Sequence, residues 1–186
     1  MPVNSDPSSI SRRLADCLAA YERKEYEIAL IHYFPALDKT AKRRRPKVGV
    51  GERIRSFLQD EEAVISAIAT GNVLQGITVD GMTFDQAIYE FGRNAIAHEG
   101  ELDPRLEFTD GGDFIWGKAL KLPSRYILGL CVSVIISPEC KQERLASSTG
   151  RVNIFGRSWE INQMFGAEKE VKEHMEAVFR RPRPFN

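Results

Sequence analysis

The feature that most constrains the fold is an apolar segment bracketed by two prolines, Pro123 and Pro138. Residues 126–136 are apolar on nearly all sides of a helix, and such a helix has to be covered by other elements. The segment is also shorter than the roughly 20 residues that a membrane span requires. We therefore expect a helix that runs through the centre of a helical bundle, and no membrane association.

Amphipathic helical spacing recurs through the rest of the chain. Apolar residues three and four positions apart predict helices over residues 9–21, 26–42, 54–70, 84–99 and 168–180. We expect Pro35, inside the second of these, to kink or restart the helix, because proline removes a helix hydrogen bond. Thr83 and Gln86 match a capping box, and Gly100 is expected to end the helix that they begin. The pattern predicts a mainly α fold, a helical bundle of five or six helices.

Short β segments complete the predicted fold. Residues 106–108 and 114–116 flank Gly111-Gly112, which predicts a β-hairpin, and a second β signal covers residues 152–161. Residues 72–82 are expected to form a loop. The chain has 186 residues, which suits one domain. We expect one or two small β-hairpins in a single helical domain over 9–180, with a flexible N-terminal arm (1–8) and a flexible tail (181–186).

Charge and cysteine content narrow the class of protein. Lys+Arg and Asp+Glu both count 26, which argues against a dedicated histone-like nucleic-acid binder but not against a local basic patch. Cys17, Cys131 and Cys140 are scattered and form no C-x-x-C pair, which favours a reducing compartment and argues against disulfides or zinc. We expect no signal segment, because residues 1–9 are polar and contain two prolines. We expect a cytoplasmic protein with no metal and no cofactor.

Several catalytic motifs are absent from the sequence. His98-Glu99 begins like a zinc-protease H-E-x-x-H motif, but position 102 is leucine. Gly49-Val50-Gly51 lacks the third glycine of a dinucleotide fingerprint. The chain contains neither a G-x-x-x-x-G-K-[ST] loop nor a G-x-S-x-G elbow. The absence of these motifs argues against the commonest classes of ATPase, dehydrogenase and hydrolase.

One arginine–histidine pair is the main functional clue. Arg93 and His98 lie five positions apart near the end of a predicted amphipathic helix, and Asn94 follows the arginine directly. Cleavage of RNA by its own 2′-hydroxyl needs a group that moves protons near neutral pH and a cation that stabilises the phosphorane. Five helical residues correspond to about 500°, so the two side chains point roughly 140° apart on an ideal helix. Asn94 lies one turn before His98 and is placed to hold its ring.

At these residues the sequence resembles the HEPN superfamily, whose signature is R-x(4–6)-H with a polar residue, often asparagine, after the arginine. The resemblance implies a small helical bundle that commonly dimerises, and His98 as general acid and base, Arg93 as transition-state stabiliser and Asn94 as a supporting group. It implies a metal-independent endoribonuclease, acting on single-stranded or loop RNA with an antitoxin or defence partner. Other members of the superfamily are non-catalytic RNA-binding or protein-interaction modules.

The sequence leaves alternatives open. A histidine at a helix C-terminus also interacts favourably with the helix dipole, and Arg93 can pair with Glu90 or Glu99 on a solvated face. The alternative function is a non-catalytic helical RNA-binding or protein-interaction module, and a weaker one is a small-molecule sensor that uses the central helix as a pocket wall. A second candidate for RNA binding is a run of basic residues, which consists of Lys42, Arg43, Arg44, Arg45 and Lys47. The alternative role for these cations is to stabilise the C-terminal end of a helix.

The remaining polar candidates carry weaker signals. His32 is expected to be a half-buried structural histidine, and His174 a residue at the boundary of a core. Glu99, Glu101 and Asp103 follow His98 closely, and they match either a solvated acidic loop, which the sequence favours, or a divalent-cation site.

Overall fold

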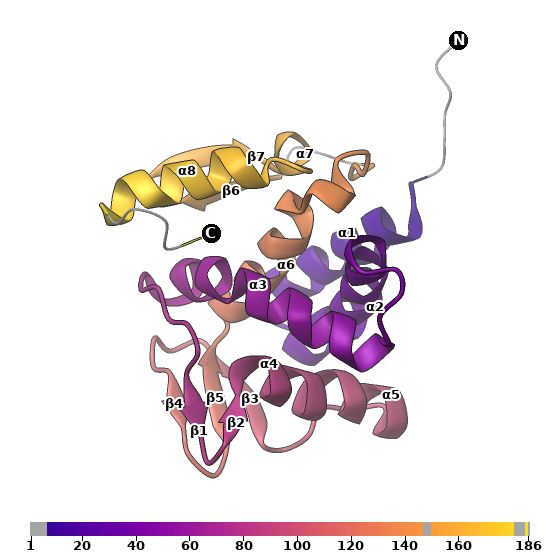
Figure 1. The fold of residues 1–186 in the computed structure, drawn as a ribbon, viewed down its shortest axis with the longest axis vertical. Helices are drawn as coiled ribbons and strands as arrows, with labels where there is room; N and C mark the ends of the chain where they lie inside the picture. The colour runs from indigo at the N-terminus through magenta and orange to yellow at the C-terminus, as the bar shows by residue number, and fades with distance from the viewer. Residues whose placement is uncertain (1–6, 147–149, 181–184, 186) are drawn as a thin grey trace.

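The computed structural model describes residues 7–146, 150–180 and 185. Its long helices are α1 (Ser9–Glu22), α2 (Tyr26–Arg44), α3 (Val50–Thr70), α6 (Arg125–Ile136) and α8 (Glu168–Phe179). A further helical segment joins α4 (Phe84–Ala87), the π-helix η1 (Ile88–Asn94) and α5 (Ala95–Glu99) without a break. The short elements α7 (Ile161–Met164) and the 3₁₀ turn η2 (Pro138–Cys140) complete the set. The predicted mainly α fold is confirmed (Figure 1).

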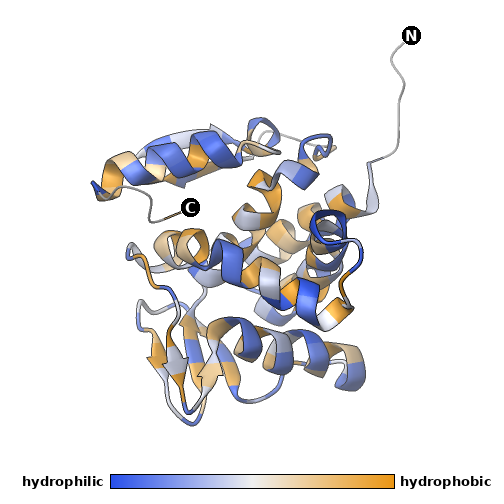
Figure 2. Ribbon diagram, in the orientation of Figure 1, coloured by the Kyte–Doolittle hydropathy of each residue, from blue (hydrophilic) through white to orange (hydrophobic). Residues whose placement is uncertain are grey.

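The proline-bracketed segment forms α6, which is buried along most of its length. Leu130, Val132 and Val134 have no exposed surface. The largest helix contacts join α1 to α2 and α3 to α6. A Cβ added at Gly129 would lie 2.6 Å from the carbonyl oxygen of Ile65, so the close approach of α6 to α3 requires glycine. Figure 2 shows apolar residues gathered where α3 and α6 face each other and their neighbours.

The restart that was one of the two outcomes expected at Pro35 is wrong, because α2 continues from Tyr26 to Arg44 with the proline inside it. The Pro35 ring is exposed, whereas Phe34 and Ala36 on either side of it are buried. Proline removes one backbone hydrogen bond from the helix, and the packing of Phe34 and Ala36 into the core offsets that loss.

The strands form three small sheets. β1 (Thr78–Val79) pairs with β2 (Met82–Thr83) and β6 (Arg151–Ile154) pairs with β7 (Arg157–Glu160), both antiparallel. The third sheet has the order β3-β5-β4 and consists of β3 (Leu106–Thr109), β4 (Ile115–Trp116) and β5 (Leu120–Pro123). The hairpin at residues 152–161 is thus confirmed.

Two β predictions are corrected. The segment around Gly111-Gly112 is not a hairpin, because β5 lies between β3 and β4, pairing parallel with β3 and antiparallel with β4. The buried side chains of Leu120 and Leu122 draw β5 into the middle of this sheet. The predicted loop over 72–82 contains the β1–β2 hairpin, whose turn residues Asp80 and Gly81 both have positive φ. Asp-Gly is the sequence preferred in such two-residue turns.

The elements are arranged in tiers. Figure 1 shows α8 with the β6–β7 hairpin at one end of the molecule and the strands β1–β5 with α4 and α5 at the other, with α3 between them. Within the described residues, no helix combines the length and apolar character that a membrane span needs. Residues 1–6 of the predicted N-terminal arm lie outside the described part, and the Ser8 side chain caps α1. Most of the predicted tail also lies outside it, but Phe185 is buried against Phe179.

Candidate functional site

The helical segment from Phe84 to Glu99 carries the arginine–histidine pair. It begins as the sequence predicts, with the Gln86 side chain accepting a hydrogen bond of 2.9 Å from the Thr83 backbone N–H. It ends at Gly100, whose φ of 84° lies in the left-handed region that glycine adopts readily. The π-helical turn η1 within it was not predicted, and turns of this kind are frequent at functional sites.

Arg93 is half-buried at the end of η1, and its guanidinium donates to the Asn94 side-chain oxygen over 3.2 Å. The Asn94 amide nitrogen in turn donates to Glu90 over 3.1 Å. Asn94 therefore orients Arg93 and does not hold the ring of His98, which corrects the role expected for it. Within the described chain Arg93 forms no ion pair, so its predicted alternative of direct pairing with Glu90 or Glu99 is wrong.

His98 is exposed in the last turn of α5. No hydrogen bond or ion pair joins its ring to another described residue. Arg93 and His98 thus share one helical segment but do not meet, because η1 ends at Asn94 and the regular α-turns after it keep the angle between the two side chains wide. One chain offers a cation and an exposed imidazole, and not a joined catalytic pair.

Arg55 and Tyr89 lie beside Arg93, and sequence analysis did not single them out. The guanidinium carbon of Arg93 lies 5.8 Å from the centroid of the Tyr89 ring, and that of Arg55, on α3, lies 5.7 Å from the same centroid. A Cβ at Gly51 would lie 2.9 Å from the Tyr89 hydroxyl oxygen, so glycine at this position lets the ring lie against α3. No local sequence pattern links Arg55 to Arg93, because only the fold brings both of them to the ring of Tyr89.

A second glycine anchors η1 on α2. A Cβ at Gly92 would lie 2.7 Å from the ring of Phe34, so the absence of a side chain permits this close approach. Phe91 and Ile88 are buried on the same segment. The backbone directly before Arg93 is therefore held by packing, whereas the segment from Ala97 to Gly100 is exposed.

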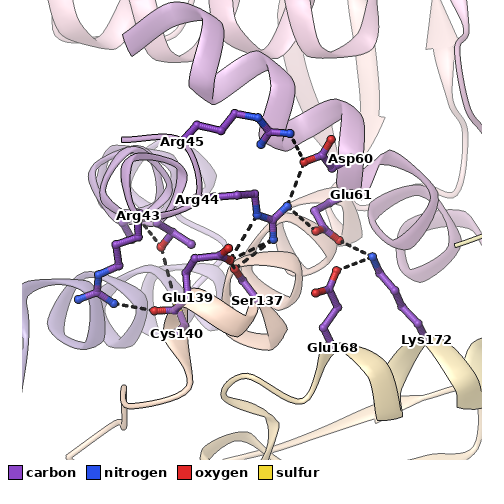
Figure 3. A network of polar contacts seen from close by, with 12 residues as sticks. Arg43, Arg44, Arg45, Asp60, Glu61, Ser137, Glu139, Cys140, Glu168 and Lys172 are labelled. Carbon is purple, nitrogen blue, oxygen red and sulfur yellow. Dashed lines mark hydrogen bonds and ion pairs between the residues drawn. The ribbon is translucent and has the colours of Figure 1, made fainter. Parts of the chain in front are cut away.

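The three arginines of the basic run at the end of α2 contact acidic residues of the same chain (Figure 3). Arg44 donates to Glu61 over 2.9 Å and lies 3.3 Å from Glu139, and Arg45 lies 2.7 Å from Asp60. Arg43 pairs with Glu143 over 2.9 Å. Lys42 and Lys47, in contrast, are exposed and pair with no carboxylate in the described chain. Of the predicted RNA-binding run, these two lysines are the residues that stay candidates for contact with phosphate.

Glu61 is the centre of this network, with only 1% of its side chain exposed. Burial raises the pKa of Glu61, and the nearby cations Lys172 and Arg44 oppose that increase. Burial also disfavours the charged form of Arg44, but the carboxylates of Glu61 and Glu139 outweigh it and raise the pKa of the guanidinium. Lys172 contacts Glu168 over 2.5 Å within α8, and its contact with Glu61 over 3.4 Å ties α8 to α3. The network joins α2, α3, α8 and the turn at Glu139.

The other histidines take the structural positions that were expected. His32 is half-buried, with its Nδ1 2.9 Å from Arg13. His174 is half-buried at the edge of the core, with its Nε2 3.0 Å from the Ile154 carbonyl oxygen.

The acidic segment after His98 shows no arrangement for a metal. Glu99 and Glu101 are exposed, and Asp103 pairs with Arg105 over 2.6 Å. Among the residues that the structure describes, no group of three or more His, Cys, Asp or Glu side chains is placed to hold a metal ion. The alternative of a cation site at these three residues therefore finds no support in their geometry.

All three cysteines are buried and free. The Sγ atoms of Cys17 and Cys131 lie 3.0 Å apart between α1 and α6. The hydrogen bond between Cys17 and Cys131, together with burial, raises the pKa of the Cys17 thiol. These thiols are part of the core packing.

The class of protein that the fold and this site define is a mainly helical protein with small peripheral sheets and an Arg-Asn-x-x-x-His segment in which Arg93 is half-buried and His98 is exposed. Residues 9–183 match the model of the Rv1289 family, and the chain belongs to that family. It is 27% identical to the uncharacterized protein Rv1289 of Mycobacterium tuberculosis and to the uncharacterized protein Mb1320 of Mycobacterium bovis, over 73% of each chain. No solved structure shows a significant match.

Proposed function

We propose that the protein is a HEPN-like, metal-independent endoribonuclease that cleaves single-stranded or loop RNA in the cytoplasm, as a toxin or defence effector built on a helical bundle. The observation that supports this proposal is the state of Arg93 and His98. Both are free of carboxylate partners in the described chain, and Arg93 is oriented by Asn94. Arg44 and Arg105, in contrast, are paired with neighbouring carboxylates.

The proposed reaction is an internal transesterification. His98 removes the proton from a ribose 2′-hydroxyl, the oxygen attacks the adjacent phosphorus, and the bond from phosphorus to the 5′-oxygen breaks. The leaving oxygen takes a proton from an imidazolium. Arg93 donates hydrogen bonds to the phosphate oxygens, on which negative charge builds in the transition state. The products are a 2′,3′-cyclic phosphate and a 5′-hydroxyl.

This chemistry supports a homodimer as part of the proposal. Two proton transfers and charge stabilisation need more groups than one separated Arg93–His98 pair offers. A two-fold axis near α5 would add a second copy of each side chain to a shared cleft. Sedimentation equilibrium at micromolar concentration tests this step, and a strict monomer would contradict it.

The decisive experiment is cleavage of a single-stranded oligoribonucleotide in EDTA, with identification of the product termini. We expect His98→Gln and Arg93→Gln each to lower the rate by roughly 10²–10⁴-fold. His32→Gln is the matched control, since it removes a histidine from another helix, and it should leave the rate unchanged. Melting temperatures measured on the same samples separate catalytic effects from unfolding.

Full activity in His98→Gln, or loss of activity on chelation, would contradict the proposed mechanism. RNA binding without cleavage would instead favour the non-catalytic module of the same fold. An antitoxin or defence partner is part of the proposal only if the protein cleaves RNA, because an active nuclease has to be restrained.

A further inference from the structure

We propose that Arg55 and Arg93, set against the Tyr89 ring, form a two-arginine site that contacts phosphate groups of an RNA strand. This inference rests on the proposed function and adds Arg55, from α3, to the RNA-contacting residues. It assigns Tyr89 the role of a positioning residue.

The geometry brings two cations to one aromatic ring. Both guanidinium carbons lie within 6 Å of the Tyr89 centroid, at 5.7 Å for Arg55 and 5.8 Å for Arg93. The negative face of the ring attracts guanidinium groups, which partly offsets the repulsion between the two arginines. All three side chains are half-buried, so an anion can reach them.

Arg55 differs from the neighbouring arginine on its own helix. Arg53, two positions earlier, contacts Asp38 over 2.6 Å and also donates to the Val48 carbonyl oxygen. Among the described residues, Arg55 has neither a carboxylate partner nor a hydrogen-bond acceptor. Two arginines that have no acidic partner in the described chain thus lie against one aromatic ring, and guanidinium groups are strong donors to anions.

The chemistry of the site favours a phosphodiester. A guanidinium presents a planar fork of donors that matches two phosphate oxygens, and two forks can contact neighbouring phosphates of one strand. Gly51 keeps the Tyr89 hydroxyl against α3, and Asn94 orients Arg93. Arg93 is therefore oriented before a ligand arrives, which lowers the entropy that binding costs.

The test uses binding, and not cleavage, so that it is separate from the test of the proposed function. The probe is a fluorescent single-stranded 2′-O-methyl oligoribonucleotide, which lacks the nucleophile and cannot be cleaved by the proposed reaction. Affinity of the full chain is measured by anisotropy over a range of salt concentrations. The variants are Arg55→Gln and Arg55→Lys, and Arg12→Gln is the control, because Arg12 is an exposed arginine on α1 without a carboxylate partner.

We expect Arg55→Gln to weaken binding roughly tenfold at low salt, and to flatten the slope of log K against log salt by about 0.7, the loss of one phosphate contact on a single strand. Arg55→Lys keeps the charge and the stem but loses the fork, so it should retain the slope and still lower the affinity. Arg12→Gln should match the wild type. The double variant Arg55→Gln/Arg93→Gln should reduce the slope by about twice as much as Arg55→Gln does.

The possible failures can be told apart. If the wild type binds the probe and Arg55→Gln leaves affinity and slope unchanged, the two-arginine site is refuted, whatever the cleavage assay shows. If Arg55→Gln weakens binding while His98→Gln leaves cleavage intact, the site stands and the proposed mechanism fails. If the wild type does not bind the probe, the two-arginine site is refuted, and the cleavage assay alone decides the proposed function.

Discussion

Replacement of Arg44 by glutamine tests whether the basic run at the end of α2 stabilises the fold. Arg44 has 15% of its side chain exposed, and its guanidinium reaches Glu61, Glu139 and Asp60. Glutamine keeps part of the stem but removes the charge. Glu61 would then remain buried with Lys172, 3.4 Å away, as its remaining cation.

The magnitude follows from what is left unpaired. Removal of one partner from a buried ion pair typically costs about 3–5 kcal/mol, because the other charge stays buried. The partial exposure of Arg44 and the retained Lys172 reduce this cost, so we expect a loss of about 2–3 kcal/mol in the free energy of unfolding. The variant should also release part of the restraint between α3 and the turn at Glu139.

Urea denaturation followed by circular dichroism provides the assay. Arg44→Gln should lower the midpoint without a change in the m-value. Lys42→Gln is the matched control, because Lys42 is exposed and unpaired in the described chain, and its effect should stay within about 0.5 kcal/mol. Equal stability of the two variants would refute the structural role. The control also has a positive use, since Lys42→Gln and Lys47→Gln should each flatten the salt dependence of RNA binding if these lysines contact phosphate.

Two further predictions concern pH and packing. Burial alone would raise the pKa of Glu143, but hydrogen bonds from Ser11, Ser8 and Arg43 together lower it. The contribution of Glu143 to stability is therefore present above its unfolded pKa of about 4.3 and is lost on acidification. Urea titrations should show that Glu143→Gln is destabilised near pH 6 and approaches the wild type near pH 3. A difference in stability that does not change with pH would contradict this. Gly129→Ala places a methyl group 2.6 Å from the Ile65 carbonyl oxygen and should cost about 2 kcal/mol or more, with a matching drop in melting temperature, whereas Gly112→Ala, with open space around it, should not.

Local patterns in the sequence predicted the elements that local chemistry determines. The helices α1, α3 and α6 follow from apolar spacing, and Gly100 ends α5 because a left-handed residue is needed there. The capping residue Thr83 and the hairpin at Gly156 follow from the same short-range preferences. The candidate residues Arg93 and His98 were also found in this way, since their spacing is a property of one helical segment.

Long-range packing decided what the sequence alone could not. The order β3-β5-β4 depends on burial of Leu120 and Leu122 against the helices, which overrides the local hairpin signal at Gly111-Gly112. The packing of Phe34 and Ala36 into the core offset the hydrogen bond lost at Pro35, and α2 continues through it.

The partners of the charged residues were decided in the same way. A charged residue's sequence neighbours say little about the carboxylate or ring that it meets across the fold. Arg44 was a candidate RNA contact until the fold placed it beside Glu61, and Arg55 was an ordinary helix arginine until the fold placed it beside Tyr89. The sequence by itself determined where the helices lie and which residues carry the motif, because these depend on neighbours a few positions apart. Only the tertiary structure decided which cations are neutralised and which are free for a ligand, because ion pairing depends on contacts between distant segments.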